Sequence, residues 1–457
     1  MSEGSSRLRG DAVAVMALGV EDPPAGIFQY WQMARSSDFI RKVFETYATR
    51  LLIVGIGLVT TILVARLLGP EGRGFYAVAA ATGALGVQFG NLGLHTANVY
   101  FAARDPESVA SLVGNSLVVS IGLGGLIAVA LAVIFTFAPN LISLQGTVLF
   151  LALSCIPLGL TYLLLQSLLL GVHDVRGYNL LETAGKVLPL VLIGALVFVR
   201  RVGVSSFFAT GLIALIVNDI CLLRRLREHF VGLISVSLAL FRNSIEYAVK
   251  AYLAAFFAFL VLRADLFMVQ HLLGPEQAGY YSIASAMADY VSVLAFVVGT
   301  ILLPKLSALK DVETKLWMTR KAAWGTAALL FPVLAASALL AKPAVRLLFG
   351  ASFLPAAGAF ILLMPGMLFL GINAVAVQFL NSIGYPKIVV IIWGLCSIGN
   401  IGFNLWVIPR YGIAGASLVS SISYFLAFLF INRVIRRTGS QLRAVNGASL
   451  TSVNPAI

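Results

Sequence analysis

The sequence predicts an all-α polytopic membrane protein, with about twelve transmembrane helices arranged as two parallel six-helix repeats around a central cavity. Three observations predict this fold class: the composition, the long apolar segments, and a motif that occurs twice. Of the 457 residues, 60% are hydrophobic and only 11% are charged. A soluble protein of this length could not bury so much apolar surface, so lipid has to solvate it.

The apolar segments are long enough to cross a membrane as helices. A spanning helix needs roughly 20 apolar residues. The segments here are apolar on all sides over that length, whereas the strands of a membrane β-barrel alternate between apolar and polar residues. We predict twelve spans, at 44–68, 75–101, 111–137, 147–171, 179–199, 205–223, 247–273, 279–303, 321–341, 355–381, 387–408 and 412–432.

One motif follows both the first and the seventh span. Residues 66–76 read Arg-Leu-Leu-Gly-Pro-Glu-Gly-Arg-Gly-Phe-Tyr, and residues 271–281 read His-Leu-Leu-Gly-Pro-Glu-Gln-Ala-Gly-Tyr-Tyr, at a shift of 205 residues. Because six spans separate the copies, both lie on the same side of the membrane, and the repeats are parallel rather than inverted. A weaker echo of residues 166–171 at 378–384 supports the duplication.

The chemistry of the motif is that of a tight turn between two helices. Gly69 can take the left-handed conformation that ends a helix, and Pro70 suits the first turn of the next helix. Glu71 then favours the positive end of that helix. We expect Gly74 to let two backbones approach closely near the membrane surface.

The loops predict the boundaries and the orientation. We divide the chain into a disordered cytoplasmic tail (1–38), an N-terminal six-helix bundle (39–235), a C-terminal six-helix bundle (236–435) and a cytoplasmic tail (436–457). Most of the 32 lysines and arginines fall on the side of the N-terminus. The positive-inside rule then places both termini in the cytoplasm and the Gly-Pro-Glu turns outside. We expect the protein in the cytoplasmic (inner) membrane.

The sequence gives no sign of a metal or a cofactor. Its three cysteines and four histidines are scattered and lack the spacing of metal ligands. The net charge of +13 would suggest nucleic acid in a soluble protein. In a membrane chain the place of each charge matters more than the sum, and we expect no nucleic-acid partner.

Polar residues inside the spans mark candidate functional positions, because they are costly in lipid. In span two, Gln88, Asn91, His95 and Asn98 have a spacing that predicts a single helix face. Such faces either hydrogen-bond neighbouring helices or line a water-accessible cavity between the halves, and their presence in both halves favours the cavity. The stripes in spans five, eight and eleven comprise Asn179, Glu182, Lys186, Ser285, Asp289, Ser292, Ser397, Asn400 and Asn404.

Charged residues in the spans suggest an anionic ligand. Cations that line a cavity attract a phosphate or pyrophosphate group, and arginine suits bidentate contact. For Arg50 and Lys250, snorkelling to the cytoplasmic surface is the alternative explanation. We predict that the substrate-binding residues are Arg263, Lys186, Arg50, Lys250, Gln88, Asn91, His95 and Asn400.

Acidic residues in the spans have two possible roles. Asp265, Glu182 and Asp289 either couple transport to a proton or sodium ion, or balance the neighbouring cations. A pair between Arg263 and Asp265 is awkward, because residues two apart on a helix point to different faces.

The assembled features resemble the multidrug, oligosaccharidyl-lipid and polysaccharide exporter superfamily, and within it the polysaccharide-transporter or O-antigen flippase branch. The resemblance rests on residues 65–76, on Gly-Asn-Leu-Gly-Leu at 90–94, and on Arg-Ala-Asp at 263–265 followed by the second motif. It covers about residues 40–435. It implies a MATE-like fold whose central cavity opens alternately to each side, and an undecaprenyl-pyrophosphate-linked oligosaccharide as cargo.

We therefore expect a flippase, not an enzyme, that moves a polyprenyl-pyrophosphate-linked oligosaccharide for surface polysaccharide biosynthesis, such as O-antigen, lipopolysaccharide or exopolysaccharide. Its expected partners are that substrate, membrane lipid, and the polymerase and glycosyltransferases of the same pathway. A drug or cation antiporter is the alternative, but it should place acidic residues in the cavity, and span one offers only Glu45. A glycopolymer ligase or polymerase would need a larger outer loop.

Overall fold

The computed structural model describes residues 37–451 apart from 139–140, 142–143, 145, 310 and 385–386, and it leaves the side chains of residues 37–50, 250 and 443–451 undescribed. The described residues form helices and no strand. In chain order the elements are α3 (Ser37–Asn91), α4 (Leu94–Arg104), the 3-10 turn η1 (Pro106–Ser108), α5 (Val109–Val118), the π turn η2 (Val119–Leu123), α6 (Gly124–Phe137), α7 (Gly146–Gly171), α8 (Val175–Phe198), α9 (Val204–Arg227), α10 (Leu238–Leu273), α11 (Pro275–Ala308), α12 (Val312–Leu339), α13 (Ala341–Leu348), the 3-10 turn η3 (Ala351–Phe353), α14 (Pro355–Ser382) and α15 (Lys387–Thr451).

The described helices provide the twelve predicted crossings. Among the described residues, ten helical stretches are long and apolar enough to cross a membrane. Two of them, of 41 and 56 residues, are at least twice as long as one crossing requires. Each of these two is broken at a glycine with positive φ, Gly69 in α3 (69°) and Gly412 in α15 (61°). Because one crossing takes roughly 20 residues, α3 and α15 each supply two.

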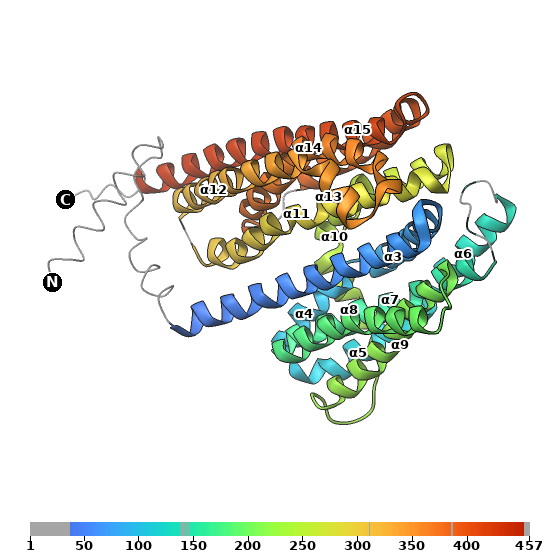
Figure 1. The fold of residues 1–457 in the computed structure, drawn as a ribbon. Coiled ribbons are helices and arrows are strands. Elements are labelled where there is room, and N and C mark those ends of the chain that lie inside the picture. The colour runs from blue at the N-terminus through green and yellow to red at the C-terminus, as the bar shows by residue number, and fades with distance from the viewer. Residues whose placement is uncertain are drawn as a thin grey trace, which may run out of the picture.

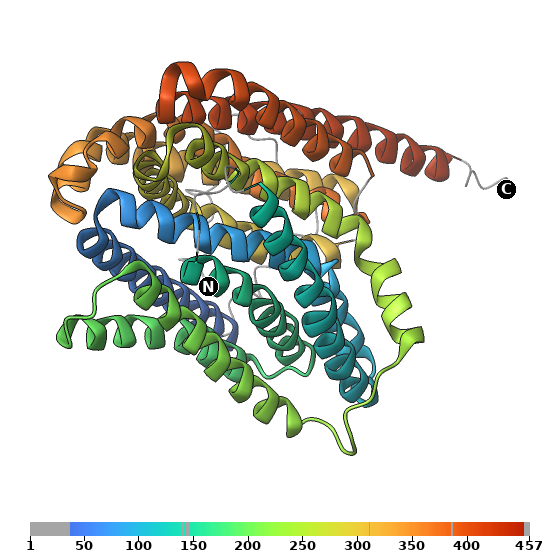
Figure 2. The same ribbon diagram turned by 90° about the vertical axis from the view of Figure 1, so that its right-hand side faces the viewer.

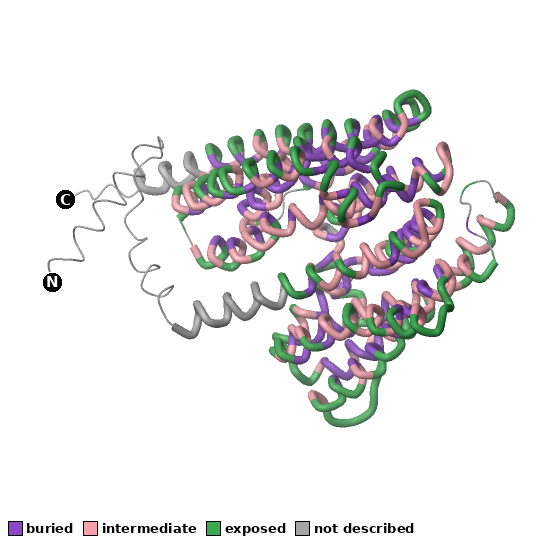
Figure 3. The backbone as a smooth tube through the Cα atoms, in the orientation of Figure 1, coloured by how far each residue is buried: buried purple, intermediate pink, exposed green. Residues whose placement is uncertain are grey.

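Many large apolar residues are exposed, and Figure 3 marks the exposed positions of the described chain in green. Phe198 is 89% exposed, Phe137 86% and Leu339 83%. A soluble protein rarely exposes large contiguous apolar surface. Together with the apolar spans, this surface makes the chain a multi-pass membrane protein.

The helices separate into two groups that pack in the same way. Figure 1 shows α10 to α15 on one side of the molecule and α4 to α9 on the other, with α3 between them. In one group α11 packs against α14, which packs against α15; in the other, α3 packs against α7, which packs against α9. This correspondence agrees with the predicted duplication. The bundle boundaries at residues 39–235 and 236–435 remain a prediction.

The connection between the two groups and the end of the chain lie at the edge of the molecule. In Figure 2 the yellow-green segment between α9 and α10 forms a peripheral loop, and the last part of α15, in red, extends beyond the other helices. The predicted C-terminal tail at 436–457 therefore begins as a continuation of α15, as far as Thr451. Of the predicted N-terminal tail at 1–38, residues 1–36 lie outside the described part.

Both copies of the repeated motif form the predicted turn. Gly69 has φ 69° and ψ −178°, and Gly274 has φ 90° and ψ 176°. A side chain is strained in this region of φ, so both positions favour glycine. Pro70 follows the break inside α3, and Pro275 begins α11, where the missing proline donor is not needed.

The two copies of the motif contact each other. A Cβ built on Gly74 would lie 1.8 Å from the carbonyl oxygen of Pro275, and one built on Gly279 would lie 1.9 Å from that of Pro70. Each glycine thus faces the backbone of the other copy, and the contact is reciprocal, as a two-fold relation requires. The prediction that Gly74 allows a close backbone approach is confirmed. We call this contact the Gly74–Gly279 crossing.

Candidate functional site

An ion pair joins α10 and α11 within their membrane-spanning length. The Nη2 atom of Arg263 donates to Oδ2 of Asp289 at 2.8 Å, and the two side chains are 36% and 37% exposed. The structure thus brings together a residue predicted to bind substrate and one predicted to couple an ion. Because both groups remain accessible, an anion could reach the guanidinium without unfolding the helix pair.

Asp265 is separate from this ion pair and is 2% exposed. Its Oδ2 accepts hydrogen bonds from the hydroxyl of Tyr281 on α11 and from Oγ of Ser420 on α15, the latter at 2.9 Å. Its Oδ1 accepts from the backbone N–H of Leu266 at 2.8 Å. Asp265 therefore ties three helices together and forms no ion pair with Arg263. Its predicted role in ion coupling stays a prediction.

The polar stripe of span two does not lie on one continuous helix, so that prediction is wrong. Helix α3 ends at Asn91 and α4 begins at Leu94, and between them Leu92 and Gly93 have φ of 49° and 80°. The break lies at a close contact with α10. A Cβ built on Gly93 would lie 2.8 Å from the Cβ of Tyr252. The four polar residues of the stripe are therefore divided between two helices.

The break leaves His95 held by its neighbours. Its Nδ1 lies 3.0 Å from Oδ1 of Asn91, which can only accept, so Nδ1 carries the proton. Its Nε2 lies 3.1 Å from the hydroxyl of Thr96. Gln88 is half-buried, and its backbone carbonyl accepts from the hydroxyl of Tyr252 at 3.0 Å. Asn91 and Thr96 thus hold the imidazole of His95 between them.

Two stripe asparagines bind neighbouring helices. Asn98 is buried and its amide donates to Oγ of Ser116 at 3.0 Å. Asn400, predicted to bind substrate, is 1% exposed; its Nδ2 donates to Oγ of Ser423, and its Oδ1 accepts from Asn404, both at 3.0 Å. In this conformation a ligand would reach the Asn400 amide only by displacing these partners.

The other predicted cations are less fully placed than Arg263. Lys186 lies on α8 and is exposed. Arg50 lies in α3 and Lys250 in α10, but the side chains of both are outside the described part of the structure. Their predicted roles stay predictions.

Sequence reasoning missed a buried carboxylate in the N-terminal half. Asp219 on α9 is 6% exposed, and neither of its oxygens has a hydrogen-bond partner among the described residues. Tyr162 of α7 interacts electrostatically with both Asp219 and the predicted Glu182 of α8. A Cβ on Gly185 would lie 3.3 Å from Nδ2 of Asn218. The adjacent Asn218 and Asp219 inside an apolar span were the signal that could have identified this cluster.

Sequence reasoning also missed Arg73, which lies in the first copy of the repeated motif. It is 8% exposed, beside the Gly74–Gly279 crossing. Its Nε donates to Oγ of Ser282 on α11 at 3.2 Å, and its guanidinium lies 5.6 Å from the ring centroid of Tyr76. No carboxylate of the described residues lies within ion-pair distance of it. Arg73 is therefore a buried cation between the two groups of helices.

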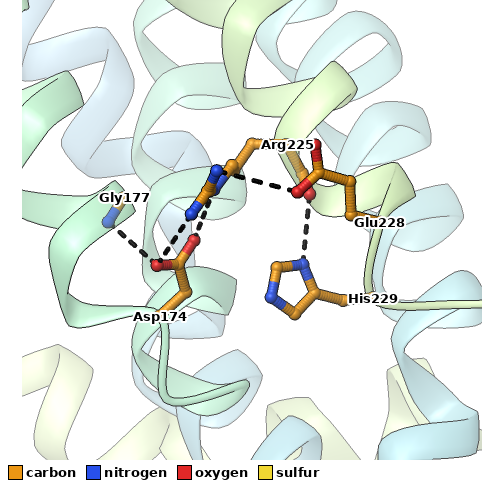
Figure 4. A network of polar contacts seen from close by, with 5 residues as sticks. All are labelled: Asp174, Gly177, Arg225, Glu228 and His229. Atoms are coloured by element: carbon orange, nitrogen blue, oxygen red, sulfur yellow. Dashed lines mark hydrogen bonds and ion pairs between the residues drawn. The ribbon is translucent and has the colours of Figure 1, made fainter.

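A polar network fixes the start of α8, at the ends of the spans opposite the Gly74–Gly279 crossing (Figure 4). Asp174 caps this helix by accepting from the N–H of Gly177 at 2.9 Å, and it accepts from Nε of Arg225 on α9 at 2.7 Å. The hydrogen bond from Arg225 is the main cause that lowers the pKa of Asp174. Arg225 also lies 3.7 Å from Glu228, and its carbonyl oxygen lies 3.1 Å from Nδ1 of His229. This network joins α8 to α9.

Side chains of the metal-binding types do not gather in the described part of the chain. Among the described residues, no three or more His, Cys, Asp or Glu side chains lie close enough together to hold a metal ion. The polar groups that the helices do bring together are cations, carboxylates, hydroxyls and amides.

Comparison with known proteins gives both a family and a fold. Residues 63–358, more than half of the chain, match the family model of polysaccharide biosynthesis proteins. The chain is 30% identical over 156 residues to an uncharacterized membrane protein, MJ1068, of Methanocaldococcus jannaschii. That match spans 34% of this chain and 31% of the relative.

Several solved structures share the arrangement of helices. An inward-facing multidrug resistance MATE family transporter of the MOP superfamily has a TM-score of 0.68 at 17% identity, over 85% of this chain and 95% of that one. The lipid II flippase MurJ, in an inward closed conformation, has a TM-score of 0.66 at 18% identity, over 85% and 87%. A MOP superfamily transporter from Pyrococcus furiosus has a TM-score of 0.58 at 16% identity, over 91% and 99%.

At these identities the solved structures show the fold alone, and it is the predicted MATE-like fold. The family follows from the sequence match, and the membrane-spanning helices agree with it. The chain belongs to the polysaccharide biosynthesis protein family.

Proposed function

We propose that the protein is a flippase that moves a polyprenyl-pyrophosphate-linked oligosaccharide from the cytoplasmic to the outer leaflet of the cytoplasmic membrane. The family membership and the fold shared with the lipid II flippase MurJ support this proposal. The single observation that carries it is the accessible Arg263–Asp289 pair inside the membrane. Charged groups in lipid are costly, and an arginine within a span that keeps part of its side chain accessible supports an anionic ligand.

The proposed binding roles follow from chemistry and exposure. Arg263 and Lys186, with Arg50 and Lys250, would bind the pyrophosphate, since cations suit phosphate oxygens. Gln88 and His95 would contact uncharged parts of the substrate, as would the buried Asn91 and Asn400 in a state in which their partners release them. Asp265, Glu182 and Asp289 would balance these cations or couple transport to a proton or sodium ion.

The proposed transport cycle is alternating access by rocking of the two bundles. In the predicted orientation, with both termini in the cytoplasm, the Gly74–Gly279 crossing lies at the outer end. The backbones are in contact there, so this end would be closed in the present conformation. Opening to the outside would separate the two copies of the motif and break the hydrogen bond from Arg73 to Ser282. Arg73 would then become a cation available at the outer end.

Removing the two charges of the pair, singly and together, tests the role of Arg263. We expect Arg263→Ala to reduce export of a surface glycan, with protein level and membrane insertion unchanged. The double variant Arg263→Ala with Asp289→Asn removes the carboxylate that Arg263 balances. If Arg263 binds pyrophosphate, the double variant stays impaired; if it only neutralises Asp289, the double variant recovers. Lys186→Ala should also lower export.

Arg410→Ala is the matched control for the loss of an arginine. Arg410 stacks on Trp406 with 4.7 Å between its guanidinium and the ring centroid, and it is exposed. Its removal should leave export unchanged. Full export by both Arg263→Ala and Lys186→Ala would exclude the proposed site.

A cation antiporter is the second candidate, and Asp219 is the observation that favours it. A buried carboxylate without a hydrogen-bond partner among the described residues is a group that could bind a proton or a cation. An antiporter would lose efflux of a cationic dye in Asp219→Asn cells. A flippase that does not use this carboxylate would keep glycan export in the same cells.

A further inference from the structure

A cavity of about 430 Å³ opens between α4, α7, α8 and α10, away from the Arg263–Asp289 pair. Its volume lies within the range of about 300–1,000 Å³ that is typical of small-molecule sites. Its lining includes His95 and Tyr100 of α4, Gln166 of α7, Tyr178 of α8 and Tyr247 of α10. The lining that the structure describes contains no Asp, Glu, Lys or Arg. The cavity therefore suits an uncharged ligand.

Gln166 provides a hydrogen-bond donor that the protein leaves unused. Its Nε2 is enclosed and has no partner among the described residues, and the side chain is 7% exposed. The corresponding glutamine of the second half, Gln378, is different: its Nε2 donates to the carbonyl of Ala374 at 3.0 Å, and its Oε1 accepts from Asn381 at 2.9 Å. A buried amide without a partner is unfavourable. A ligand hydroxyl in the cavity is the acceptor that Gln166 lacks.

Aromatic rings supply the rest of the recognition surface. Tyr100 and Tyr247 stack with 4.4 Å between their centroids and 16° between their planes, and so join α4 to α10. Nη1 of Arg104 donates to the hydroxyl of Tyr100 at 3.2 Å, which fixes that ring from outside the cavity. The face of an aromatic ring is electron-rich, and the C–H face of a pyranose ring is its electrostatic complement.

We propose that this cavity holds one or two uncharged sugar rings of the substrate headgroup, and we call it the sugar pocket. The assignment rests on the proposed flippase function and adds a place for the sugar apart from that for the pyrophosphate. His95, the unused Gln166 amide and the tyrosines match a ligand rich in hydroxyl groups rather than a prenyl chain. Lys186 lies eight residues after Tyr178 on α8, or about 12 Å along the axis. A pyrophosphate bound near Lys186 would therefore lie close to the first sugars.

Binding to the purified full-length protein in lipid nanodiscs tests the sugar pocket. Two probes are titrated by microscale thermophoresis: undecaprenyl pyrophosphate, and undecaprenyl pyrophosphate that carries an N-acetylglucosamine disaccharide. We expect wild-type protein to bind the sugar-bearing probe more tightly. Gln166→Ala and Tyr247→Leu should each weaken that probe about tenfold, the loss expected for one hydrogen bond or ring contact, and leave the sugarless probe unchanged.

The controls separate this proposal from the flippase proposal. Gln378→Ala, the matched variant in the other half, should change neither affinity, whereas Lys186→Ala should weaken both probes. Tyr247 is 48% exposed, so Tyr247→Leu remains a usable variant even if Gln166→Ala fails to insert. Equal weakening of both probes by the pocket variants would assign the cavity to the prenyl chain and overturn the sugar pocket alone. Equal binding of both probes by wild-type protein would overturn it as well. Binding of neither probe would overturn both proposals.

Discussion

Replacing Gly74 with alanine perturbs the contact between the two copies of the motif. The new methyl carbon would lie 1.8 Å from the carbonyl oxygen of Pro275. Carbon and carbonyl oxygen in proteins come no closer than about 3.3 Å, so α3 and α11 would have to separate by about 1.5 Å along this direction. The obstacle is backbone, which cannot rotate away as a side chain can.

The cost of this overpacking sets the expected size of the effect. Forcing an extra carbon into a packed contact costs about 1–3 kcal/mol. Only the conformation with the crossing closed bears this cost, because the open conformation separates the two glycines. The ratio of open to closed protein should therefore rise roughly 5- to 150-fold.

Distances between spin labels at Glu71 and Glu276 measure this shift. The two positions are equivalent in the two copies of the motif, and both are exposed. The labels go onto cysteines in a background that lacks Cys155, Cys221 and Cys396. We expect Gly74→Ala to populate a longer distance that wild-type protein rarely shows.

Gly211→Ala is the matched control, because a Cβ there meets nothing within 4 Å. It should keep the wild-type distances. A Gly74→Ala protein with the wild-type distance distribution and melting temperature would refute the reasoning from the crossing.

Three further predictions concern buried or networked polar groups. Asp174 has a lowered pKa in the folded protein, so its stabilising effect is complete above its unfolded pKa of about 3.9 and is lost as pH falls through the folded value. The melting temperature should accordingly fall more steeply on acidification below about pH 4 in wild-type protein than in Asp174→Asn. Ser420→Ala should lower the free energy of unfolding by about 1 kcal/mol, because its hydrogen bond to Asp265 is lost. Asp265→Ala should lower it further, because it also leaves the Tyr281 hydroxyl unpaired. Denaturation in detergent measures both changes. Arg73→Met removes a buried cation and should keep or raise the melting temperature while slowing transport, whereas a lower melting temperature with normal transport would assign Arg73 a purely structural role.

Most of the fold could be predicted because its signals are local. The hydrophobic length of each span and the Gly-Pro dipeptides of the turns are read directly from neighbouring residues. The duplication was visible because both copies keep the leucines, the proline and the glycines of the turn. What the sequence could not show is that Gly74 and Gly279 face each other, because that depends on how two distant helices cross.

The depth and the partners of the charged residues were harder to predict. Arg73 follows a turn and therefore looked like a loop residue, but the crossing beside it places it between packed helices. Arg263 and Asp289 are 26 residues apart and meet across a turn, so no helical spacing rule connects them. The stripe of span two failed as a single face because Leu92 and Gly93 break the helix where α10 crosses it.

The proposed function is tested most directly by a flipping assay with the purified protein. Proteoliposomes are loaded with a fluorescent undecaprenyl-pyrophosphate-linked disaccharide, and a membrane-impermeant enzyme that cleaves the sugar reports how much substrate reaches the outer leaflet. We predict rapid exposure of the inner pool with wild-type protein, slower exposure with Arg263→Ala, and the wild-type rate with Arg410→Ala. Exposure no faster than in protein-free vesicles, under the conditions in which the protein binds the substrate, would contradict the assignment as a flippase.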